Sequence, residues 1–577
     1  MSAGPGADPA CTSLRWAAAL FVGLFSAGLR RVVLSPGSRS TPLLLAAQRQ
    51  PDLELLPILD ERSAGFFALG LARASRQPVA LVCTSGSAPA HWLPAVIEAH
   101  ASAVPLVLLS ADRPSWLRPW GANQTVDQTR LFGAFVLEFH DPGPPEENAD
   151  ALKAVQALGR RAAAVSTGRR AGPVHINLPF PEPLVPRGDC GDQAGDAAEP
   201  PASVPAPCRR HRPAVPEGQA AKALLRGRGL IVCGPGAATD GIAGALWQAA
   251  RELALPVLVD PLSGLRFGPG GGERIARYDG LLRNPAAADR LRPDWVVRFG
   301  AAPVSKTLTE WLRGVPSILS DPGGQWRDPT QDARLCSDAD PGELLDWLAG
   351  GAGVQPCTAW RDRWAAAEDR VSRVADDHLD RAGWCEPQVI RTLIGTLPAG
   401  TGLFSGNSLP VRQLDTWSGT RGAPLAVHCN RGASGIDGNV STLAGLNAGG
   451  QPTLGLIGDL ALVHDLTGLL QAGWLSLPLI VINNGGGRIF DYLPQHGLPG
   501  FTALWRTPTD LDLTAAARLF RVPHRLARDA EGFAAALEEA LAASVPGMIE
   551  LRIDAELSRR VHLDFWRLVR REALVPS

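Results

Sequence analysis

Residues 453–487 are predicted to form a strand–helix–strand unit in which polar residues and glycines follow each strand. The apolar run 453–457 predicts a buried strand, residues 460–475 have helical spacing, and residues 478–482 predict the next strand. A unit of this kind belongs to an open α/β sheet. Such sheets bind their ligands at the carboxyl ends of the strands.

The two strand ends carry oxygen ligands that suit Mg²⁺. Asp459 follows the first strand, and Asn484 follows the second, 25 positions later (484 − 459). A carboxylate, an amide oxygen and a backbone carbonyl, for which Gly486 is the candidate, are the hard ligands that this ion prefers beside phosphates and water. The glycines also let the backbone approach a diphosphate closely. An ordinary crossover, whose Asp caps a helix and whose Asn-Gly makes a turn, is the alternative.

The overall composition narrows the class of protein. A length of 577 residues allows three or four domains, and a net charge of −1 gives no global field that attracts nucleic acid or a membrane. The nine cysteines are scattered without a CxxC pair and are interpreted as reduced thiols. Residues 16–29 are apolar but shorter than the about 20 residues of a membrane span. A helix from Thr12 to Gly28 explains them better, so we expect a cytoplasmic protein.

The first predicted strand, 31–35, runs into a turn that opens a helix and carries Ser38 and Arg39. Hydroxyls, backbone donors and an arginine at a helix start make an anion site. A surface turn with a capping serine is an equal alternative.

Glu61 lies where the predicted strand 53–59 meets a helix, just before a stripe of small and aromatic residues. Most glutamates in such a position interact favourably with the helix dipole. The alternative is a carboxylate held in a partly apolar cleft for proton exchange.

The fold class is predicted to be α/β, with three doubly wound parallel-sheet domains. Apolar strands followed by glycine or polar turns recur along the chain. A stretch rich in Pro, Ala, Gly and Asp without periodicity is interpreted as a linker. The predicted parts are an N-terminal domain (1–185), the linker (186–216), a central α/β domain (217–355), a helical connector (356–384) and a C-terminal domain (385–577).

Five motifs in a fixed order resemble one family. They are Ser-Pro-Gly-Ser-Arg-Ser-Thr-Pro (35–42), Asp-Glu-Arg-Ser-Ala-Gly-Phe (60–66), Gly-Asn-Ser-Leu (406–409), Asn-Arg-Gly-Ala-Ser-Gly-Ile-Asp-Gly (430–438) and Gly-Asp-Leu (458–460). Together with the Asp and Asn pair they resemble thiamine diphosphate (ThDP) enzymes of the decarboxylase-like type. The finer match is to the 2-succinyl-5-enolpyruvyl-6-hydroxy-3-cyclohexene-1-carboxylate synthase family of menaquinone and phylloquinone biosynthesis.

The resemblance implies ThDP and Mg²⁺ (or Mn²⁺) as cofactors, a pyrimidine-binding N-terminal domain and a diphosphate-binding C-terminal domain. It implies decarboxylation of 2-oxoglutarate and 1,4-addition to isochorismate. Because both substrates are dicarboxylates, the site needs several cations. In this family a glutamate that matches Glu61 hydrogen-bonds the aminopyrimidine, and an apolar residue that matches Ile436 holds the cofactor bent.

The residues that match the family's site fall into four sets. The implied catalytic residues are Glu61, Gln124, Arg39 and Arg412. The implied cofactor-binding residues are Glu61, Ser408, Ile436, Gly458, Asp459, Leu460, Asn484, Gly486 and Phe490. The implied metal ligands are Asp459, Asn484 and Gly486. The implied substrate-binding residues are Ser38, Arg39, Arg113, Asn123, Gln124, Lys306, Ser408, Arg412 and Arg431.

Three positions depart from the general pattern. Leu460 replaces the second glycine of the Gly-Asp-Gly of many ThDP enzymes, which this family also does. Gly485 stands where family members usually carry Asn, so the ligand register stays open by one position. Thr307 stands beside Lys306 where some relatives have Arg, which leaves one carboxylate contact open.

Two other functions remain open from the sequence. Other ThDP-dependent 2-oxoacid decarboxylases or carboligases handle smaller substrates and need fewer cations. A non-catalytic diphosphate-binding scaffold needs the metal ligands but not Glu61. If Glu61 and Asp459 serve one site, the family architecture implies a homo-oligomer, either a dimer or a dimer of dimers, with active sites at the subunit interface.

Overall fold

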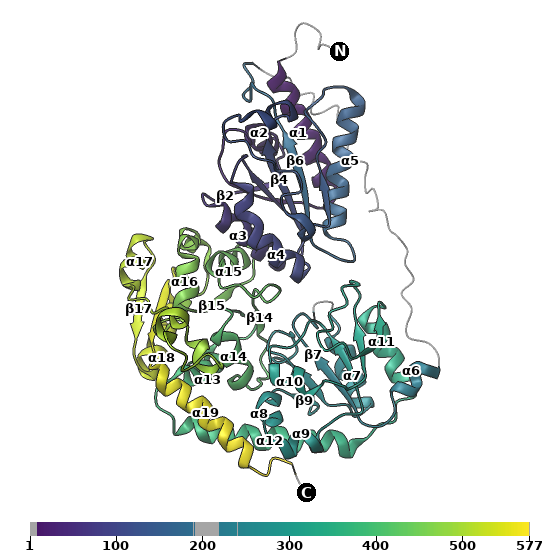
Figure 1. Ribbon diagram of the computed structural model, residues 1–577, viewed down its shortest axis with the longest axis vertical. Coiled ribbons are helices and arrows are strands. Elements are labelled where there is room, and N and C mark those ends of the chain that lie inside the picture. The colour runs from purple at the N-terminus through teal and green to yellow at the C-terminus, as the bar shows by residue number, and fades with distance from the viewer. Residues whose placement is uncertain (1–7, 189, 191–218, 239–240, 576–577) are drawn as a thin grey trace. The chain divides into compact units, whose positions relative to one another are not determined.

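The computed structural model describes residues 8–188, 190, 219–238 and 241–575 and contains three six-stranded sheets (Figure 1). The predicted linker, 186–216, lies almost entirely outside the described residues. Contacts divide the chain into a first unit (Met1–Arg210, Asn430–Gln451 and His464–Leu475) and a second unit (His211–Cys429, Pro452–Val463 and Ser476–Ser577). All described strand pairs within the sheets are parallel, so the predicted α/β class with three parallel sheets is confirmed.

The first sheet has the strand order β2-β1-β3-β4-β6-β5. Its strands are β1 (Arg31–Leu34), β2 (Glu54–Pro57), β3 (Val79–Cys83), β4 (Leu106–Asp112), β5 (Glu138–His140) and β6 (Pro173–Pro179). Its helices are α1 (Pro9–Ser26), α2 (Thr41–Gln48), α3 (Glu61–Ser75), α4 (Leu93–Ser102) and α5 (Ala149–Ser166), with short turns η1 (Pro89–Trp92), η2 (Ser115–Trp120) and η3 (Gly133–Phe135). Every residue of β3, β4 and β6 is buried, which is why these strands are rich in apolar residues in the sequence.

The second sheet has the strand order β12-β11-β10-β7-β8-β9. Its strands are β7 (Gly229–Cys233), β8 (Val257–Val259), β9 (Arg274–Ile275), β10 (Trp295–Phe299), β11 (Ser317–Ser320) and β12 (Ala333–Ser337). The helices of this part are α6 (Gln219–Leu224), α7 (Ala243–Glu252), α8 (Tyr278–Leu282), α9 (Pro285–Arg290), α10 (Lys306–Trp311), α11 (Pro341–Asp346), η5 (Trp347–Gly351) and α12 (Thr358–Asp380).

The third sheet has the strand order β14-β13-β15-β16-β18-β17. Its strands are β13 (Gly402–Ser405), β14 (Ala426–His428), β15 (Thr453–Gly458), β16 (Leu479–Asn483), β17 (His524–Ala527) and β18 (Met548–Arg552). The helices and turns of this part of the sequence are α13 (Glu386–Thr396), α14 (Leu409–Trp417), α15 (Asn439–Ala448), α16 (Asp459–His464), η6 (Leu466–Trp474), η7 (Arg488–Tyr492), η8 (Thr502–Arg506), α17 (Leu513–Leu519), α18 (Ala530–Ala542) and α19 (Ala555–Arg571).

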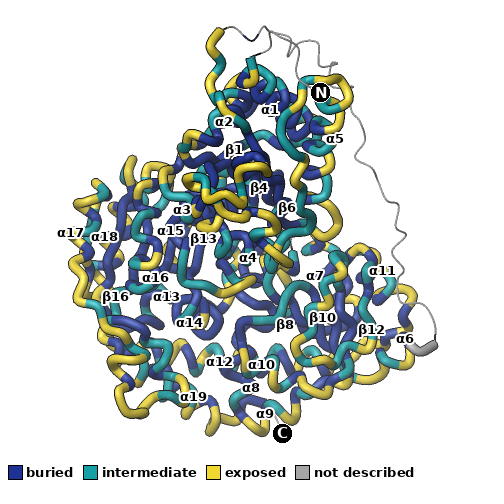
Figure 2. The backbone as a smooth tube through the Cα atoms, turned by 45° about the horizontal axis from the view of Figure 1, so that its top comes forward, coloured by how far each residue is buried: buried dark blue, intermediate teal, exposed yellow. Residues whose placement is uncertain are grey.

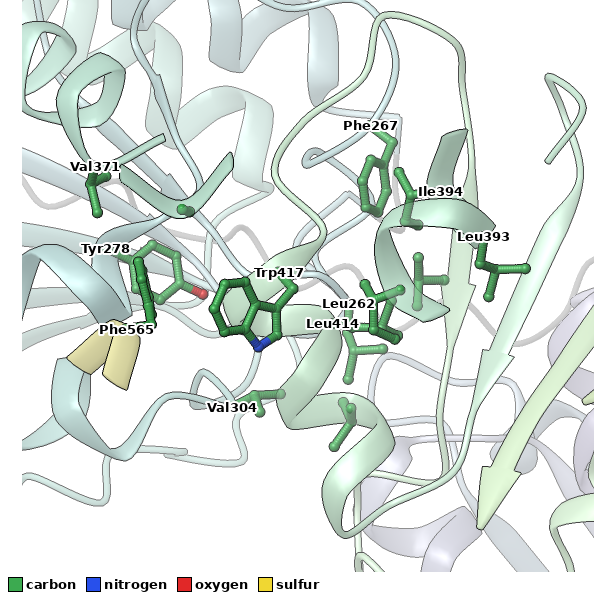
Figure 3. Packing of buried hydrophobic residues seen from close by; sticks show 14 of the residues in the cluster. Leu262, Phe267, Tyr278, Val304, Val371, Leu393, Ile394, Leu414, Trp417 and Phe565 are labelled. Atoms are coloured by element: carbon green, nitrogen blue, oxygen red, sulfur yellow. The ribbon is translucent and has the colours of Figure 1, made fainter. Parts of the chain in front are cut away.

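The core of the second unit runs from the second sheet's helices to the third sheet's helices (Figure 3). Trp417 of α14 and Phe565 of α19 have ring centroids 4.7 Å apart. Tyr278 of α8 donates its hydroxyl to Asp415 at 2.7 Å, and Val371 of α12 belongs to the same cluster. In both units the sheets form the buried interior, while turns and outer helix faces are exposed (Figure 2).

The apolar segment near the N-terminus is helix α1, as predicted, but the helix starts earlier than expected. The Asp8 side chain accepts a hydrogen bond from the N–H of Ala10 and thereby caps the helix, and Pro9 occupies its first turn. None of the helices that the structure describes combines the length and the apolar character of a membrane span.

The interpretation of all cysteines as thiols is wrong. Cys11 of α1 and Cys190 form a disulfide, with Cα atoms 5.3 Å apart, although 179 positions separate them in sequence. Cys208 lies outside the described residues. The sequence could not reveal the pair, because the two residues meet only when the segment after β6 passes the start of α1.

Candidate active site

The predicted residues of the first unit follow strands of its sheet. Because neighbouring strands are parallel and in register, their carboxyl ends form one edge. Arg39 follows β1, Glu61 follows β2, and Arg113 follows β4. The loops at this edge are packed tightly, since a Cβ at Gly37 would overlap the Thr84 side chain in the loop after β3.

Glu61 is the first residue of α3, but it is not the residue that caps the helix. Asp60 performs that role, because its Oδ1 accepts the N–H of Arg62 at 2.9 Å. Thr467 donates its hydroxyl to Oδ2 of Asp60 at 2.8 Å. Burial raises the pKa of Cys83, at the end of β3, well above its usual value, and the charge of Glu61 adds to this shift. Asp60 is therefore the capping residue, and Glu61 lies in the first turn of α3, where a carboxylate also interacts favourably with the helix dipole.

Two buried guanidinium groups lie at the same edge. Arg39 donates from Nη1 to the Phe180 carbonyl at 2.9 Å and from Nη2 to Glu182 Oε1 at 2.8 Å. Its Nε is buried and has no hydrogen-bond partner among the described residues. Burial, and then the positive charge of Arg39, lower the pKa of Arg113. The two arginines therefore form a local concentration of positive charge, which a bound carboxylate would relieve.

Arg113 also holds the loop that carries Asn123 and Gln124. It donates to the Gln124 carbonyl at 2.6 Å and to the Ser85 hydroxyl. Gln124 has a φ of 53°, and its Nε2 donates to the Ser85 carbonyl at 3.0 Å. Asn123 and Gln124 are both exposed. Ser38, on the first turn, accepts the Thr41 hydroxyl at its carbonyl oxygen.

The loop 430–438, which carries Arg431 and Ile436, is held by a residue that the sequence analysis did not include. Glu98 of α4 accepts the N–H of Gly432 at 3.0 Å and that of Ala433 at 2.6 Å. The same buried carboxylate pairs with Arg73 at 2.7 Å. A glutamate within a helix gives no sequence signal for this role, since its burial depends on the packing of α4.

In the second unit, Asp459 begins α16 and is 5% exposed. Its Oδ2 accepts the N–H groups of Gly485 at 3.0 Å and Gly486 at 2.9 Å, and its Oδ1 accepts the N–H of Leu460. Burial raises the pKa of Asp459, although these three N–H groups stabilise the charged form. The carboxylate therefore joins the end of β15, where Gly458 lies, to the glycine turn after β16.

The glycine turn explains why position 485 tolerates no ordinary side chain. Gly485 has a φ of 80° and Gly486 a φ of 114°, both in the left-handed region. A Cβ at Gly486 would also overlap the Arg506 carbonyl oxygen. Asn, the usual family residue at 485, is one of the few others that adopts such a conformation.

The residues at these strand ends fit a divalent cation. Asn484 donates its Nδ2 to Glu386 at 2.8 Å, while its Oδ1 is buried and has no hydrogen-bond partner within the described chain. In the described parts of the structure, no three His, Cys, Asp or Glu side chains gather as a metal site. The candidate donors are Asp459, Asn484 and a backbone carbonyl, so only one of them is a carboxylate. Such a set suits Mg²⁺ beside a diphosphate, because the phosphates supply further negative oxygen ligands. A cavity of about 460 Å³ adjoins Asn483, Asn484 and Gly485.

Three further predicted residues lie elsewhere in the second unit. Ser408 precedes α14 with a φ of 70° and a ψ of −123°, a conformation that non-glycine residues adopt at a cost of about 1–3 kcal/mol and that is concentrated at functional sites. Arg412 is exposed and donates to the Ser408 carbonyl at 2.6 Å. Phe490 lies in η7, beside Gly487 of the glycine turn.

Lys306 begins α10, and its side chain is 87% exposed. In the described part of the chain its ion pair is with Glu310, 3.4 Å away on the same helix. The neighbouring Thr307 lies near Asp279 instead and helps to lower the pKa of that carboxyl. None of the hydrogen bonds or ion pairs described for Lys306 joins it to the other predicted residues.

Known proteins match almost the whole chain. The family model "Thiamine pyrophosphate enzyme, N-terminal TPP binding domain" matches residues 14–131, and "Middle domain of thiamine pyrophosphate" matches residues 208–405. A solved structure, the Rhodococcus jostii RHA1 thiamine diphosphate-dependent 4-hydroxybenzoylformate decarboxylase, is similar with a TM-score of 0.67 and 19% identity. It covers 93% of this chain and 99% of its own, which supports the fold.

Relatives in sequence define the family more closely. A 2-succinyl-5-enolpyruvyl-6-hydroxy-3-cyclohexene-1-carboxylate synthase from Geobacillus kaustophilus is 42% identical over 96% of this chain and 98% of its own length. Proteins of the same name from Chloroflexus aurantiacus and Dechloromonas aromatica are 42% and 40% identical over 96% and 94% of this chain, and over 96% and 99% of their own lengths. The chain therefore belongs to the 2-succinyl-5-enolpyruvyl-6-hydroxy-3-cyclohexene-1-carboxylate synthase family of thiamine diphosphate enzymes.

Proposed function

We propose that this enzyme decarboxylates 2-oxoglutarate and adds the succinyl unit to isochorismate in a 1,4-addition, as a step in menaquinone or phylloquinone biosynthesis. The product is 2-succinyl-5-enolpyruvyl-6-hydroxy-3-cyclohexene-1-carboxylate. The observation that carries the proposal is the 42% identity, over 96% of the chain, to a relative with that activity in its name.

The metal site is assigned to Asp459, Asn484 and the carbonyl of Gly486. The unpartnered Oδ1 of Asn484 supports this assignment, because a buried oxygen requires a donor or a cation. Mg²⁺ is the proposed ion, and Mn²⁺ can replace it. The proposed cofactor contacts are completed by Glu61, Ser408, Ile436, Gly458, Leu460 and Phe490. Bound ThDP supplies a carbon nucleophile and accepts the electrons released by decarboxylation.

Glu61 is proposed to hold a proton at N1′ of the aminopyrimidine. Its position supports this role, since Asp60 caps α3 and leaves the Glu61 carboxylate outside the capping interaction. A scaffold that only bound a diphosphate would require Asp459 but not Glu61.

The substrate carboxylates are proposed to bind to the cations and amides among the residues that match the family's site. Arg39 and Arg113 support this assignment, since both are buried and their charges interact. The remaining proposed contacts are Ser38, Asn123, Gln124, Lys306, Ser408, Arg412 and Arg431. Of these, Gln124, with Glu61, Arg39 and Arg412, is proposed to act on the reacting atoms.

The family architecture also supports a different role for each domain of the chain. Residues 1–185 form the proposed pyrimidine-binding domain, residues 385–577 the diphosphate-binding domain, and residues 217–355 a central domain, with 186–216 and 356–384 as linker and connector. We propose a homodimer or a dimer of dimers with active sites at the subunit interface.

The test is to mix the purified protein with ThDP, Mg²⁺, 2-oxoglutarate and isochorismate and to follow the loss of isochorismate by absorbance. We expect consumption that requires all four components. Glu61→Gln should lower the rate by at least 10²-fold, in the range of general acid–base catalysis. Glu54→Gln, which changes a carboxylate on the neighbouring strand β2, is the matched control and should keep the rate.

Release of CO₂ from 2-oxoglutarate without loss of isochorismate would replace the proposal by a simple decarboxylase. Tight ThDP binding without turnover would identify a scaffold.

A further inference from the structure

Two successive asparagines at the end of β16 each donate to a different buried glutamate. Asn483 donates its Nδ2 to Glu550 Oε1 at 2.8 Å, and Asn484 donates its Nδ2 to Glu386 Oε1 at 2.8 Å. Glu550 belongs to β18 and Glu386 to α13, so the two asparagines are held by different elements. The two glutamates therefore hold Asn484, the candidate metal ligand, and its neighbour Asn483 in different places.

Glu386 determines which end of the Asn484 amide faces the proposed metal. The oxygen and nitrogen of an amide have nearly the same shape, so only their hydrogen-bond partners decide the orientation. A carboxylate oxygen accepts but does not donate, and it therefore attracts the NH₂ end of the amide. The Oδ1 end is left buried and without a partner in the described chain, as a metal ligand must be.

Glu386 is itself held rigidly. It is the first residue of α13 and is 1% exposed. Gln413 of α14 donates to Oε2 of Glu386 at 3.1 Å. The backbone N–H of Glu386 donates to the Ser558 hydroxyl at 3.1 Å. Helix α14 thus holds the carboxylate of Glu386, and helix α19 holds its backbone. All of these residues lie in the second unit.

We propose that Glu386 is a positioning residue of the metal site, which fixes the Asn484 amide so that Oδ1 is the ligand atom. This inference rests on the metal site of the proposed function. It selects Asn484 over Asn483 and thereby decides the register that the sequence left open. Groups that orient metal ligands typically change metal affinity by 10- to 100-fold when they are mutated.

The test uses two variants of Glu386 and one of Glu550 in the full-length protein. Glu386→Met keeps the length and apolar volume of the side chain but removes the acceptor. Glu386→Gln keeps an acceptor, because its amide oxygen can face Asn484. The Gln413 amide, which now donates Nε2 to Glu386 and whose Oε1 has no partner in the described chain, can turn over to accept the new NH₂. Glu550→Gln makes the equivalent change beside Asn483.

The measurement is the dissociation constant of Mg²⁺ for the ThDP-saturated protein, obtained by calorimetry. We expect a 10- to 100-fold increase for Glu386→Met and less than a threefold change for Glu386→Gln and Glu550→Gln. Activity of Glu386→Met should recover at high Mg²⁺, since the amide can still reach the ligand orientation. A merely structural role would lower the melting temperature without this dependence on Mg²⁺.

Equal Mg²⁺ affinities for Glu386→Met and Glu386→Gln would overturn the inference and leave the proposed function intact. A wild-type protein that binds no Mg²⁺ with ThDP would overturn both. If Glu386→Met does not fold, Glu386→Asp takes its place. That variant keeps the charge but withdraws it by one methylene, so its affinity should fall several-fold, and an unchanged affinity would contradict the inference.

Discussion

Gly70 of α3 and Gly445 of α15 form a reciprocal pair where the two helices cross within the first unit. A Cβ on Gly70 would overlap the Thr442 carbonyl oxygen, and a Cβ on Gly445 would overlap the Phe67 carbonyl oxygen. The backbones therefore touch at this crossing, which only glycine permits. Because α3 begins with Glu61 and α15 follows the loop 430–438, this crossing connects two proposed parts of the active site.

The first prediction follows from this contact. Gly445→Ala should lower the free energy of unfolding by about 1–3 kcal/mol, because the added methyl group forces the helices apart. Gly244→Ala in α7 is the control, since Gly244 is exposed with no neighbouring atom within 4 Å. That variant should gain about 0.5–1 kcal/mol from helix propensity. Urea unfolding measures both, and a Gly445→Ala protein as stable as wild type would contradict the contact.

The second prediction concerns Glu98, which holds the loop 430–438. Glu98→Gln should cost about 3 kcal/mol of unfolding free energy, because it removes the negative charge that faces Arg73 and presents an NH₂ group to backbone donors. Amide hydrogen exchange at Gly432 and Ala433 should become faster than in wild type. The exposed pair of Arg31 and Glu54 is the control, and Glu54→Gln should change stability by no more than about 1 kcal/mol. Unchanged exchange at the loop would show that Glu98 does not hold it.

The third prediction concerns Glu182, whose exposed carboxylate is paired with Arg39. If Arg39 binds a substrate carboxylate, Glu182 competes for the same guanidinium group. Removing a pair with an exposed partner releases up to about 1 kcal/mol, so Glu182→Gln should lower the KM for one substrate by up to about fivefold. Initial rates at varied substrate concentration measure this. A higher KM in this variant would show that Glu182 assists binding.

The fourth prediction concerns the pH dependence of stability. Burial, and then the charge of His140, lower the pKa of His175 to about 3, while an unfolded histidine titrates near 6.5. Below pH 6.5 the unfolded chain therefore binds a proton that the folded chain does not, and stability falls as the pH falls. Between pH 6.5 and pH 5 the loss from this group is about 2 kcal/mol.

His175→Gln should remove this part of the pH dependence while retaining a polar partner for the Ser110 hydroxyl, which lies 2.7 Å from Nε2 of His175. The measurement is urea unfolding at pH 5, 6 and 7. His91→Gln, on the exposed side of η1, is the control and should leave the wild-type slope. Parallel stability curves for His175→Gln and wild type would contradict the prediction.

Local patterns predicted the fold because each signal came from residues close in sequence. The predicted strand 31–35 matches β1, and the unit 453–482 matches β15, α16, η6 and β16. No comparable run of apolar residues marks the strands β5, β9, β11, β12 and β17 in the sequence. Four of them lie at sheet edges, and all but β12 have fewer than five residues, so few apolar residues are needed there.

Some residues of the candidate site are likewise recognisable from the sequence, and others are not. Asp459, Asn484 and Glu61 stand out in the sequence because chemistry requires their residue types at strand ends. Glu386 and Glu98 do not, since both are glutamates in helices whose burial comes from other elements.

The sequence by itself thus determined the sheet class and the family, and it proposed the residues of the candidate site, because periodicity and short motifs are local. Only the tertiary structure decided which carboxylates are buried, which amide oxygen is left without a partner, and that Cys11 meets Cys190. The physical reason is that burial and hydrogen-bond partnership are properties of contacts between distant segments. Those contacts form only when the packed helices and sheets exclude water.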